Sequence, residues 1–437
     1  MSTLPVTPVT SVSLDVHHVT RVEGHGNIVV DVQNGVLKHC ELQIIETPRF
    51  FEAMLRGRPY TDAPHLVSRI CGICSVGHQT ASVQALEAAL EVTPSEQAML
   101  LRKLLFHGEI LDSHILHVYM LVAPDFYGAG SVLPLASSHP QVVLRALRMK
   151  KTAGDLCAMI GGRHTHPVTM RVGGFTRLPA AGELEKLRAR LDGLRGDVDA
   201  TVELFRSLTV PDFERSTEYI ALSLPDEYAF IGGTITSTDG FQLPVSAYRE
   251  VTNEFLVPHS TAKHTSHHRE SYMVGALARF NINHARLHPR ARAAAVALGL
   301  KPICANPYMN SAAQVVEIAH CVEDAVALID KLLARGILPE APPAVDIRAG
   351  EGVAACEVPR GTLYHHYRIG DDGQVAGANC IIPTGQNLAN IEADMRALVP
   401  RILDRTPDQI RLALEMLVRA YDPCISCATH MLDIRFE

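Results

Sequence analysis

The sequence predicts an α+β fold that is mainly α, with a central bundle of long helices between β segments in the N-terminal and C-terminal parts. Three observations lead to this prediction. Apolar residues recur at three- and four-residue spacing through the middle of the chain, which is typical of packed helices. Apolar and polar residues partly alternate before and after that middle, which favours strands. With 437 residues, 47% of them hydrophobic, the chain can bury a large core.

The first β segment is expected over residues 12–46. Apolar and polar residues partly alternate around Asn34-Gly35, a dipeptide that strongly favours a two-residue hairpin turn. The helical body is expected over residues 47–336, with lengths that suit a packed bundle. Its periodic stretches are 80–90, 95–122, 141–159, 181–208, 244–255, 285–298 and 313–333.

A proline-rich segment, ILPEAPPAVDIR, ends the helical body. A second β segment is expected over 345–385, with alternation over 353–383 and a turn at residues 370–373, Gly-Asp-Asp-Gly. Residues 386–437 are expected to hold the last helix, at 407–420, and a metal-ligand segment. No internal repeat or low-complexity segment divides the chain, so residues 1–437 are expected to form a single multi-layer unit.

Charge and composition exclude several classes of protein. The net charge is −7 and no basic block interrupts the mixed charges, which disfavours nucleic-acid binding. No uninterrupted run of ~20 apolar residues predicts a membrane span, and the first residues lack the pattern of a signal peptide. Ten scattered cysteines do not resemble a secreted disulfide framework. We therefore expect a cytoplasmic protein with reduced thiols.

Two cysteine pairs at opposite ends of the chain are the main chemical signal. Both have the form CxxC followed by a histidine: Cys71, Cys74 and His78 in RICGICSVGH, and Cys424, Cys427 and His430 in DPCISCATH. Four thiolates suit zinc, an iron–sulfur cluster or another soft-ligand centre. They can serve one site only if the fold brings the two ends together.

By spacing alone, a structural zinc site is the ordinary interpretation of four cysteines. Three features disfavour it here. The pairs are much farther apart than in zinc ribbons, each pair is followed by a histidine that a four-cysteine site does not need, and polar residues suited to proton transfer lie near both motifs. Zinc remains the weaker alternative.

Arg69 before the first pair and Asp422 before the second extend the motifs to RxCGxCxxxH and DPCxxCxxH. The sequence here resembles the large, catalytic subunit of nickel-iron hydrogenases, and the likeness runs from Arg21 to His430. The resemblance implies reversible oxidation of H2 at a nickel–iron centre whose iron carries carbon monoxide and cyanide. It also implies that nickel is bound by Cys71, Cys74, Cys424 and Cys427, and iron by Cys74 and Cys427.

The segment TRVEGHG resembles the family's RxEGH motif. The resemblance implies that Glu23 passes protons to and from the nickel ligand Cys424, which is the candidate first proton acceptor. An isolated glutamate near a hairpin is more often simply solvated. Because Arg21, Gly24 and His25 complete the motif, the functional interpretation is favoured.

The resemblance also implies a magnesium ion. Glu52 in PRFFEAMLRG matches a magnesium ligand of the family, His430 is its expected partner, and Cys380 is expected to contribute its backbone carbonyl. One carboxylate and one imidazole form a sparse set for magnesium, which ordered water would complete. In some relatives the same site holds iron or calcium.

Further residues are placed around the metals by the same resemblance. Arg360 in EVPRGTLYHHYRI matches an arginine above the open face of the metals, and Asp422 is expected to pair with it. The alternative is an arginine of a surface turn. His78 is expected to support a ligand cysteine and not to bind metal. In GGRHTHPVTMRVGGF, His166 is expected to help form the wall near the site, and His164 to serve packing.

The other cysteines show no CxxC spacing, and the chain has no GxGxxG fingerprint. Electrons therefore need another subunit. The resemblance implies an iron–sulfur small subunit, and it implies further subunits that bind flavin or NAD(P), since several segments look most like the soluble, cytoplasmic, bidirectional branch. Maturation factors and a C-terminal endopeptidase are also implied, although only MLDIRFE follows His430. Two alternatives remain, an H2-sensing regulatory hydrogenase and a non-catalytic relative from complex I, and the four retained cysteines disfavour the second.

Overall fold

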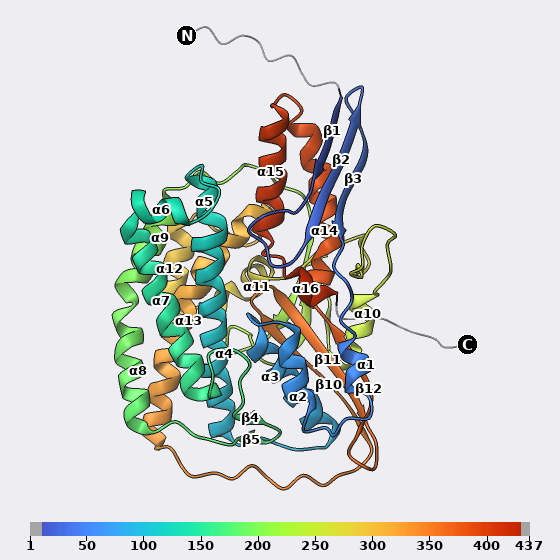
Figure 1. Cartoon of the computed structure of the whole chain (residues 1–437). Helices are drawn as coiled ribbons and strands as arrows, with labels where there is room; N and C mark the ends of the chain where they lie inside the picture. The colour runs from blue at the N-terminus through green and yellow to red at the C-terminus, as the bar shows by residue number, and fades with distance from the viewer. Residues whose placement is uncertain (1–10, 430–437) are drawn as a thin grey trace, which may run out of the picture.

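A bundle of helices and several small β-sheets lie side by side in the computed structural model, which describes residues 11–429 (Figure 1). The α+β, mainly α fold class is therefore confirmed. The helices are α1 (Phe51–Leu55), α2 (Ala63–Val67), α3 (Ser75–Ala89), α4 (Glu96–Leu116), α5 (Ala123–Phe126), α6 (Leu133–Ser138), α7 (Pro140–Gly161), α8 (Ala181–Gly193), α9 (Arg195–Arg206), α10 (Tyr248–Thr252), α11 (Ala276–Asn283), α12 (Pro289–Ala297), α13 (Asn310–Arg335), α14 (Pro383–Leu398), α15 (Pro407–Ala420) and α16 (Ile425–Ala428). The strands are β1 (Val12–Val16), β2 (Gly26–Gln33), β3 (Val36–Ile44), β4 (Met170–Arg171), β5 (Gly174–Phe175), β6 (Glu218–Ser223), β7 (Thr234–Ser237), β8 (Gln242–Leu243), β9 (Tyr272–Met273), β10 (Gly350–Val358), β11 (Gly361–Ile369) and β12 (Val375–Ile381).

The N-terminal sheet is a three-stranded antiparallel sheet in the order β1-β2-β3. Its hairpin turn lies where the sequence predicts it, since Asn34 and Gly35 have φ angles of 50° and 75°. Positive φ at both central residues is the requirement of a type I′ turn. Ile28, Val30 and Val32 alternate along β2 and are buried, which sets the register by placing one face of the sheet on the core.

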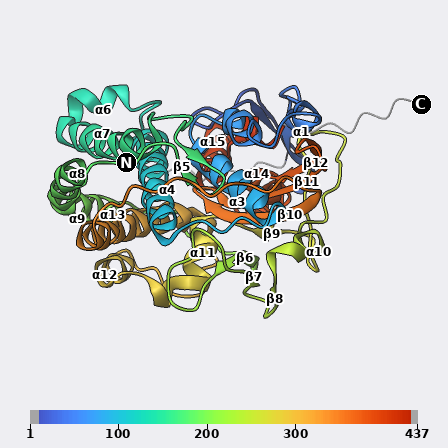
Figure 2. The same cartoon turned by 90° about the horizontal axis from the view of Figure 1, so that it is seen from below.

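Helix α13 lies in the bundle against α4, α8, α9 and α12, and α4 also packs on α7 (Figure 2). The Ser95 hydroxyl accepts the Ala98 N–H at 3.0 Å and caps the start of α4. The helix predicted over 95–122 is present, but its last part, His117–Val122, is a π-helical turn. Among residues 11–429, no helix is long and apolar enough to cross a membrane.

The structure corrects three predicted helices. The stretch 181–208 forms two helices, α8 and α9, which meet at Leu194 between Gly193 and Gly196. The stretch 244–255 contains only a 3-10 turn and the five-residue α10, which ends where Asn253 adopts a φ of 28°. The helix predicted over 285–298 begins only at Pro289, which occupies the first turn of α12. The preceding residue, His288, has an extended backbone.

Other elements were not predicted at all. Helix α14 follows the second β segment, and the sheet with strand order β8-β7-β6-β9 lies inside the expected helical body. The structure therefore has β structure inside the expected helical body in addition to the two predicted β segments. Strand β6 is buried along most of its length and so lacks the alternation that marks a half-exposed strand. The division of the chain into segments at the predicted boundaries stays a prediction.

The C-terminal sheet is antiparallel, in the order β10-β11-β12, and it supports the first cysteine motif. Helix α3 packs directly on β10 and β11. Gly350 and Gly352 permit this approach, because a Cβ at either position would collide with backbone atoms of α3. The predicted turn at Gly370–Gly373 joins β11 to β12, with the Gly373 N–H donating to the Gly370 carbonyl.

Candidate metal centre

The fold brings both ends of the chain to one place. Cys74 precedes the first residue of α3, and Cys424 precedes the first residue of α16. Glu23 forms a parallel β-bridge with Cys424, in which the Ile425 N–H donates to the Glu23 carbonyl at 2.9 Å. Figure 1 shows α16 near the middle of the molecule, between the helix bundle and the β-sheets. The N-terminal segment thus holds the C-terminal motif in position.

The four motif cysteines form one buried cluster. Their sulfur atoms all lie within 4.8 Å of one another, and each residue is at most 6% exposed. The Sγ atoms of Cys71 and Cys424 are 3.5 Å apart, and those of Cys74 and Cys427 are 3.6 Å apart. Soft thiolates at this spacing can share one metal ion, and two of them can be shared with a second. The donor set therefore fits a nickel–iron centre.

The electrostatics of the cluster also call for a cation. Burial raises the pKa of Cys424 and of Cys427 well above the ordinary value of a thiol. Hydrogen bonds from neighbouring thiols, from Cys424 first, lower the pKa of Cys71. The backbone N–H groups of Ile73 and Cys74 also donate to Cys71 Sγ, both at 3.3 Å. Several thiolates in this buried place are stable only with positive charge among them.

Glu23 lies directly beside this cluster. The Cys424 thiol donates to Glu23 Oε2 at 3.1 Å, and the Ser426 N–H donates to the same oxygen at 3.0 Å. Glu23 itself is only partly buried. Arg21 points elsewhere, donating to the Leu121 carbonyl at 2.7 Å and to Asp125 Oδ1 at 2.5 Å. A carboxylate within hydrogen-bond reach of a thiol can exchange a proton with it.

Arg360 and Asp422 form a buried ion pair beside the same cysteines. Arg360 Nε donates to the Asp422 carbonyl at 2.7 Å, and Nη2 donates to Asp422 Oδ1 at 3.0 Å. Gln314 Nε2 donates to the other carboxylate oxygen at 3.1 Å. Burial alone would lower the pKa of Arg360, but the charge of Asp422 and then those of the cysteines outweigh it and raise that pKa. The guanidinium is therefore a fixed positive charge next to the thiols.

The structure describes two of the three residues of the expected magnesium site, Glu52 and Cys380. Glu52 in α1 is 7% exposed, and α1 packs against β12, the strand that carries Cys380. Burial first, and then the charge of Glu52, raise the pKa of the Cys380 thiol. His430 lies outside the described residues. Thr429, just before it, accepts the Arg49 N–H at 2.8 Å. The described chain thus ends beside the segment that carries Glu52.

The predicted histidines occupy positions around the cysteine loops. His78 Nδ1 lies 3.2 Å from His365 Nε2. His166 is partly buried; its N–H donates to Ser75 Oγ at 3.0 Å and its Nδ1 lies 2.8 Å from the Ser68 carbonyl. His164 is half-exposed, near Asp112. The remaining cysteines are buried except Cys304, which is partly exposed: Cys40, Cys157, Cys304, Cys321, Cys356 and Cys380.

Three residues near the cluster were missed by the sequence analysis. Arg49 Nη2 donates to the Ile70 carbonyl at 2.6 Å and also to the Ser426 carbonyl, so it ties the two cysteine segments together. Glu109 in α4 accepts the N–H groups of the residues that begin α3, and burial raises its pKa. Thr384 Oγ1 accepts the Cys424 N–H at 2.9 Å. No motif spacing marks these residues, because each acts on backbone groups of a distant segment.

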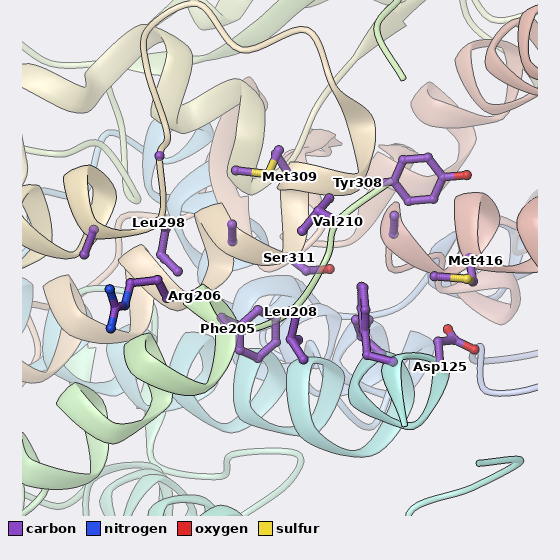
Figure 3. Close-up of a pocket in the computed structure, with 16 residues that line it drawn as sticks. Asp125, Phe205, Arg206, Leu208, Val210, Leu298, Tyr308, Met309, Ser311 and Met416 are labelled. Atoms are coloured by element: carbon purple, nitrogen blue, oxygen red, sulfur yellow. The ribbon is translucent and has the colours of Figure 1, made fainter. Parts of the chain in front are cut away.

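A largely apolar cavity of about 270 Å³ lies outside the cysteine cluster (Figure 3). Phe205, Leu208 and Met309 line it, and Asp125 and Ala420 also belong to its wall. Asp125 accepts hydrogen bonds from Arg21 and Arg419, so the cavity borders the ion pairs beside the Glu23 segment. Its lining residues do not include the motif cysteines.

Comparisons with known proteins agree with this geometry. Residues 49–141 and 247–430 match the family model described as nickel-dependent hydrogenase. Sulfhydrogenase 1 subunit alpha of Pyrococcus furiosus is 34% identical over 96% of this chain and 98% of its own length. The NAD-reducing hydrogenase HoxS subunit beta of Cupriavidus necator is 27% identical over 95% of this chain and 94% of its own. A crystal structure of an NAD+-reducing NiFe-hydrogenase in the H2-reduced state has a TM-score of 0.86 and 28% identity, covering 97% of this chain and 100% of that chain.

Proposed function

The chain belongs to the nickel-dependent hydrogenase family, and we propose that it is the catalytic large subunit of a nickel–iron hydrogenase that oxidises H2 reversibly to protons and electrons. The observation that carries this proposal is the buried set of four sulfur atoms within 4.8 Å, with Glu23 Oε2 at 3.1 Å from one of them. A structural zinc site would need neither the carboxylate nor the buried guanidinium nearby.

In the proposed ligand set, Cys71, Cys74, Cys424 and Cys427 hold nickel, and Cys74 and Cys427 also hold an iron that carries carbon monoxide and cyanide. Support comes from the sulfur–sulfur distances of 3.5 and 3.6 Å between the two motifs. When bound, such a centre supplies the redox chemistry for splitting H2 heterolytically. The other steps are performed by the residues of this chain.

Glu23 carries the proton in this proposal. Cys424 accepts the first proton on Sγ, and the thiol passes it to Glu23 Oε2, which lies at hydrogen-bond distance. The Ser426 N–H holds the carboxylate in this position. Because Glu23 is only partly buried, it can release the proton outward, which a fully buried carboxylate could not do without further carriers.

Arg360 stabilises the negative charge that develops during the reaction. This role is supported by the two hydrogen bonds from Arg360 to Asp422, which fix the orientation of the guanidinium. Asp422 positions the arginine, and Gln314 in turn holds Asp422. His78 and His166 support the cysteine loops from outside the ligand set.

A magnesium ion at Glu52, the Cys380 carbonyl and His430 is also part of the proposal. The buried Glu52 carboxylate near Cys380 supports it. We assign this ion a structural role, because it would join α1 and the C-terminal sheet to the end of the chain.

The electrons leave through partner subunits. We propose an iron–sulfur small subunit, followed by subunits that bind flavin and NAD(P), in the cytoplasm. Support comes from relatives named as alpha or beta subunits, one of them NAD-reducing. Maturation factors would install the metals, and an endopeptidase would process the tail after His430.

The test is a metal and turnover measurement on the complex purified with its partners. We expect one nickel per chain, iron in excess of that held by the iron–sulfur clusters of the partners, and H2-dependent reduction of an electron-accepting dye and of NAD(P)+. Zinc in the four-cysteine site without H2 turnover would contradict the proposal. Nickel and iron with only very slow turnover would identify a hydrogen sensor instead.

A further inference from the structure

A second group of potential metal ligands lies away from the cysteine cluster. Glu218 is the first residue of β6, and His267 and His268 lie in the loop before β9. Asp239 lies in the turn between β7 and β8. Figure 2 shows these strands together at one edge of the molecule. Three segments distant in sequence thus bring carboxylates and imidazoles together.

The donor atoms of this group face one another at short distances. His267 Nδ1 and His268 Nδ1 are 2.8 Å apart. His267 Nδ1 lies 3.2 Å from Glu218 Oε1, and His268 Nδ1 lies 3.4 Å from Glu218 Oε2. A tetrahedral ion with bonds of about 2.0–2.1 Å places its ligand atoms about 3.3 Å apart. The observed spacing is close to that value without any rearrangement of the chain.

One oxygen of the buried Glu218 carboxylate has no hydrogen-bond donor in the described part of the chain. Glu218 is fully buried; its Oε1 accepts the Ser237 hydroxyl at 2.6 Å, while no hydrogen-bond donor within residues 11–429 satisfies Oε2. A buried carboxylate oxygen without a donor is costly. A cation between Glu218 and the two imidazoles would remove that cost.

Asp239 fixes the orientation of His268. His268 Nε2 lies 2.7 Å from Asp239 Oδ2, and Arg269 donates to both oxygens of the same carboxylate. A proton on Nε2 leaves the lone pair of His268 on Nδ1, directed toward His267 and Glu218. Metal-binding histidines usually donate their other N–H to a carboxylate in this manner. The tautomer that the structure favours is therefore the one that binds a metal ion.

We propose that Glu218, His267 and His268 bind a divalent transition-metal ion of the zinc type, with water as the fourth ligand. Two imidazoles and one carboxylate form a ligand set that suits zinc. Because His268 is half-exposed, the ion can enter from solvent and water can reach it. Bound there, it would attach the loop before β9 to the start of β6.

A comparable group, His259, His264 and Glu392, lacks these features. Glu392 Oε1 already accepts the Leu42 N–H and faces His259 Nε2 at 2.7 Å, and Oε2 accepts Arg396 at 2.7 Å. A cation bound by Glu392 would therefore lie against a guanidinium. Both oxygens of Glu392 are therefore satisfied without a metal, and the unsatisfied buried atom of this group is His264 Nε2, not a carboxylate oxygen.

The test measures zinc binding to the purified complex, freed of loosely bound metal with a weak chelator and then given Zn²⁺ alone. We expect the wild-type complex to bind one more zinc ion per chain than the His268→Gln variant. Asp239→Asn should weaken this binding about 10–100-fold, because it weakens the support of His268 while the three ligand residues remain. His39→Gln, which changes another exposed histidine, is the matched control and should bind as wild type does.

Glu218→Gln gives a second check, because the amide can still accept the Ser237 hydroxyl and the fold should persist. Loss of the additional zinc in this variant would support the proposal. Equal zinc binding by the wild type, His268→Gln and Glu218→Gln would overturn it. Nickel and iron content should be unchanged throughout, so this result is independent of the hydrogenase assignment.

Discussion

Two charged groups beside the cysteine cluster are built differently: Glu23, which we call the acidic side, and the Arg360–Asp422 ion pair, which we call the basic side. On one side, Glu23 is partly buried, and its Oε2 accepts hydrogen bonds from the Cys424 thiol and from the backbone N–H of Ser426. On the other side, Arg360 and Asp422 are 4% and 2% exposed and are joined by two hydrogen bonds. The acidic side can exchange protons with its surroundings, whereas the basic side is fixed.

This difference follows from the two tasks that we propose. A proton carrier must be able to change its charge, which a partly solvated carboxylate does at low cost. A group that stabilises developing charge works best when it is already oriented and cannot reorganise. We therefore consider substitutions on each side in turn, beginning with the four-cysteine centre beside which both sides lie.

Removing one shared ligand should have the largest effect. We expect Cys427→Ser to lose nickel and H2 turnover together, because a serine hydroxyl is a poor ligand for a soft metal at neutral pH. Metal analysis and dye reduction measure the two losses. Cys304→Ser, at a partly exposed cysteine outside the cluster, is the control and should keep both. Full nickel retention by Cys427→Ser would contradict the ligand set.

Removing the titratable group on the acidic side should leave the metals in place. Glu23→Gln can still accept the Ser426 N–H but cannot carry a proton, so we expect H2 oxidation to fall about 10²–10⁴-fold. Nickel content and dye reduction should be measured on the same sample. Glu203→Gln on an exposed part of α9 is the matched control. Wild-type turnover in Glu23→Gln would remove this residue from the proton path.

Replacing Arg360 on the basic side should slow the reaction without changing the proton path through Cys424 and Glu23. Arg360→Lys keeps the charge but cannot form the paired hydrogen bonds to Asp422, so we expect a loss of about 10²-fold or more in H2 activation. Exchange between H2 and D2O, followed with the nickel content, measures this step. Arg206→Lys, at a mostly exposed arginine, is the control. If Arg360→Lys reacts normally, Arg360 has a structural role only.

The smallest effect is expected for Gln314, which donates a hydrogen bond to Asp422. Gln314→Leu removes one donor to Asp422 while the two Arg360 contacts remain. A hydrogen bond to a charged group contributes about 1.5–3 kcal/mol, so a loss of about 3–10-fold in turnover is expected if about half of that energy is used in positioning. The rate should be compared with the melting temperature. A larger loss than that of Arg360→Lys would reverse the order that we infer.

The sequence predicts which cysteines the fold brings together and which charged residues lie beside them, because these residues lie in short motifs with fixed spacing. The roles of these residues stay predictions. It predicts the N-terminal hairpin equally well, since Asn34-Gly35 specifies its own turn. It does not predict Arg49 or Glu109, whose partners are backbone groups of distant segments. Those contacts exist only after the whole chain has folded.

The errors in the fold have a similar cause. Helical periodicity alone does not reveal that a helix breaks at Leu194, since both halves keep their apolar face on α13. Strand β6 is short and buried, so its pattern is indistinguishable from that of a buried helical turn. The histidines before β9 carry no recognisable spacing either, and only the folded sheet brings them to Glu218.

The most direct test of the account is an infrared spectrum of the purified complex, recorded for the wild type and for Glu23→Gln, in the region where metal-bound carbon monoxide and cyanide absorb. The account predicts the same set of bands in both proteins, with shifts under H2 in the wild type that are suppressed or much slower in Glu23→Gln. Absence of these bands from a fully metallated wild-type sample would contradict the nickel–iron assignment of the four cysteines.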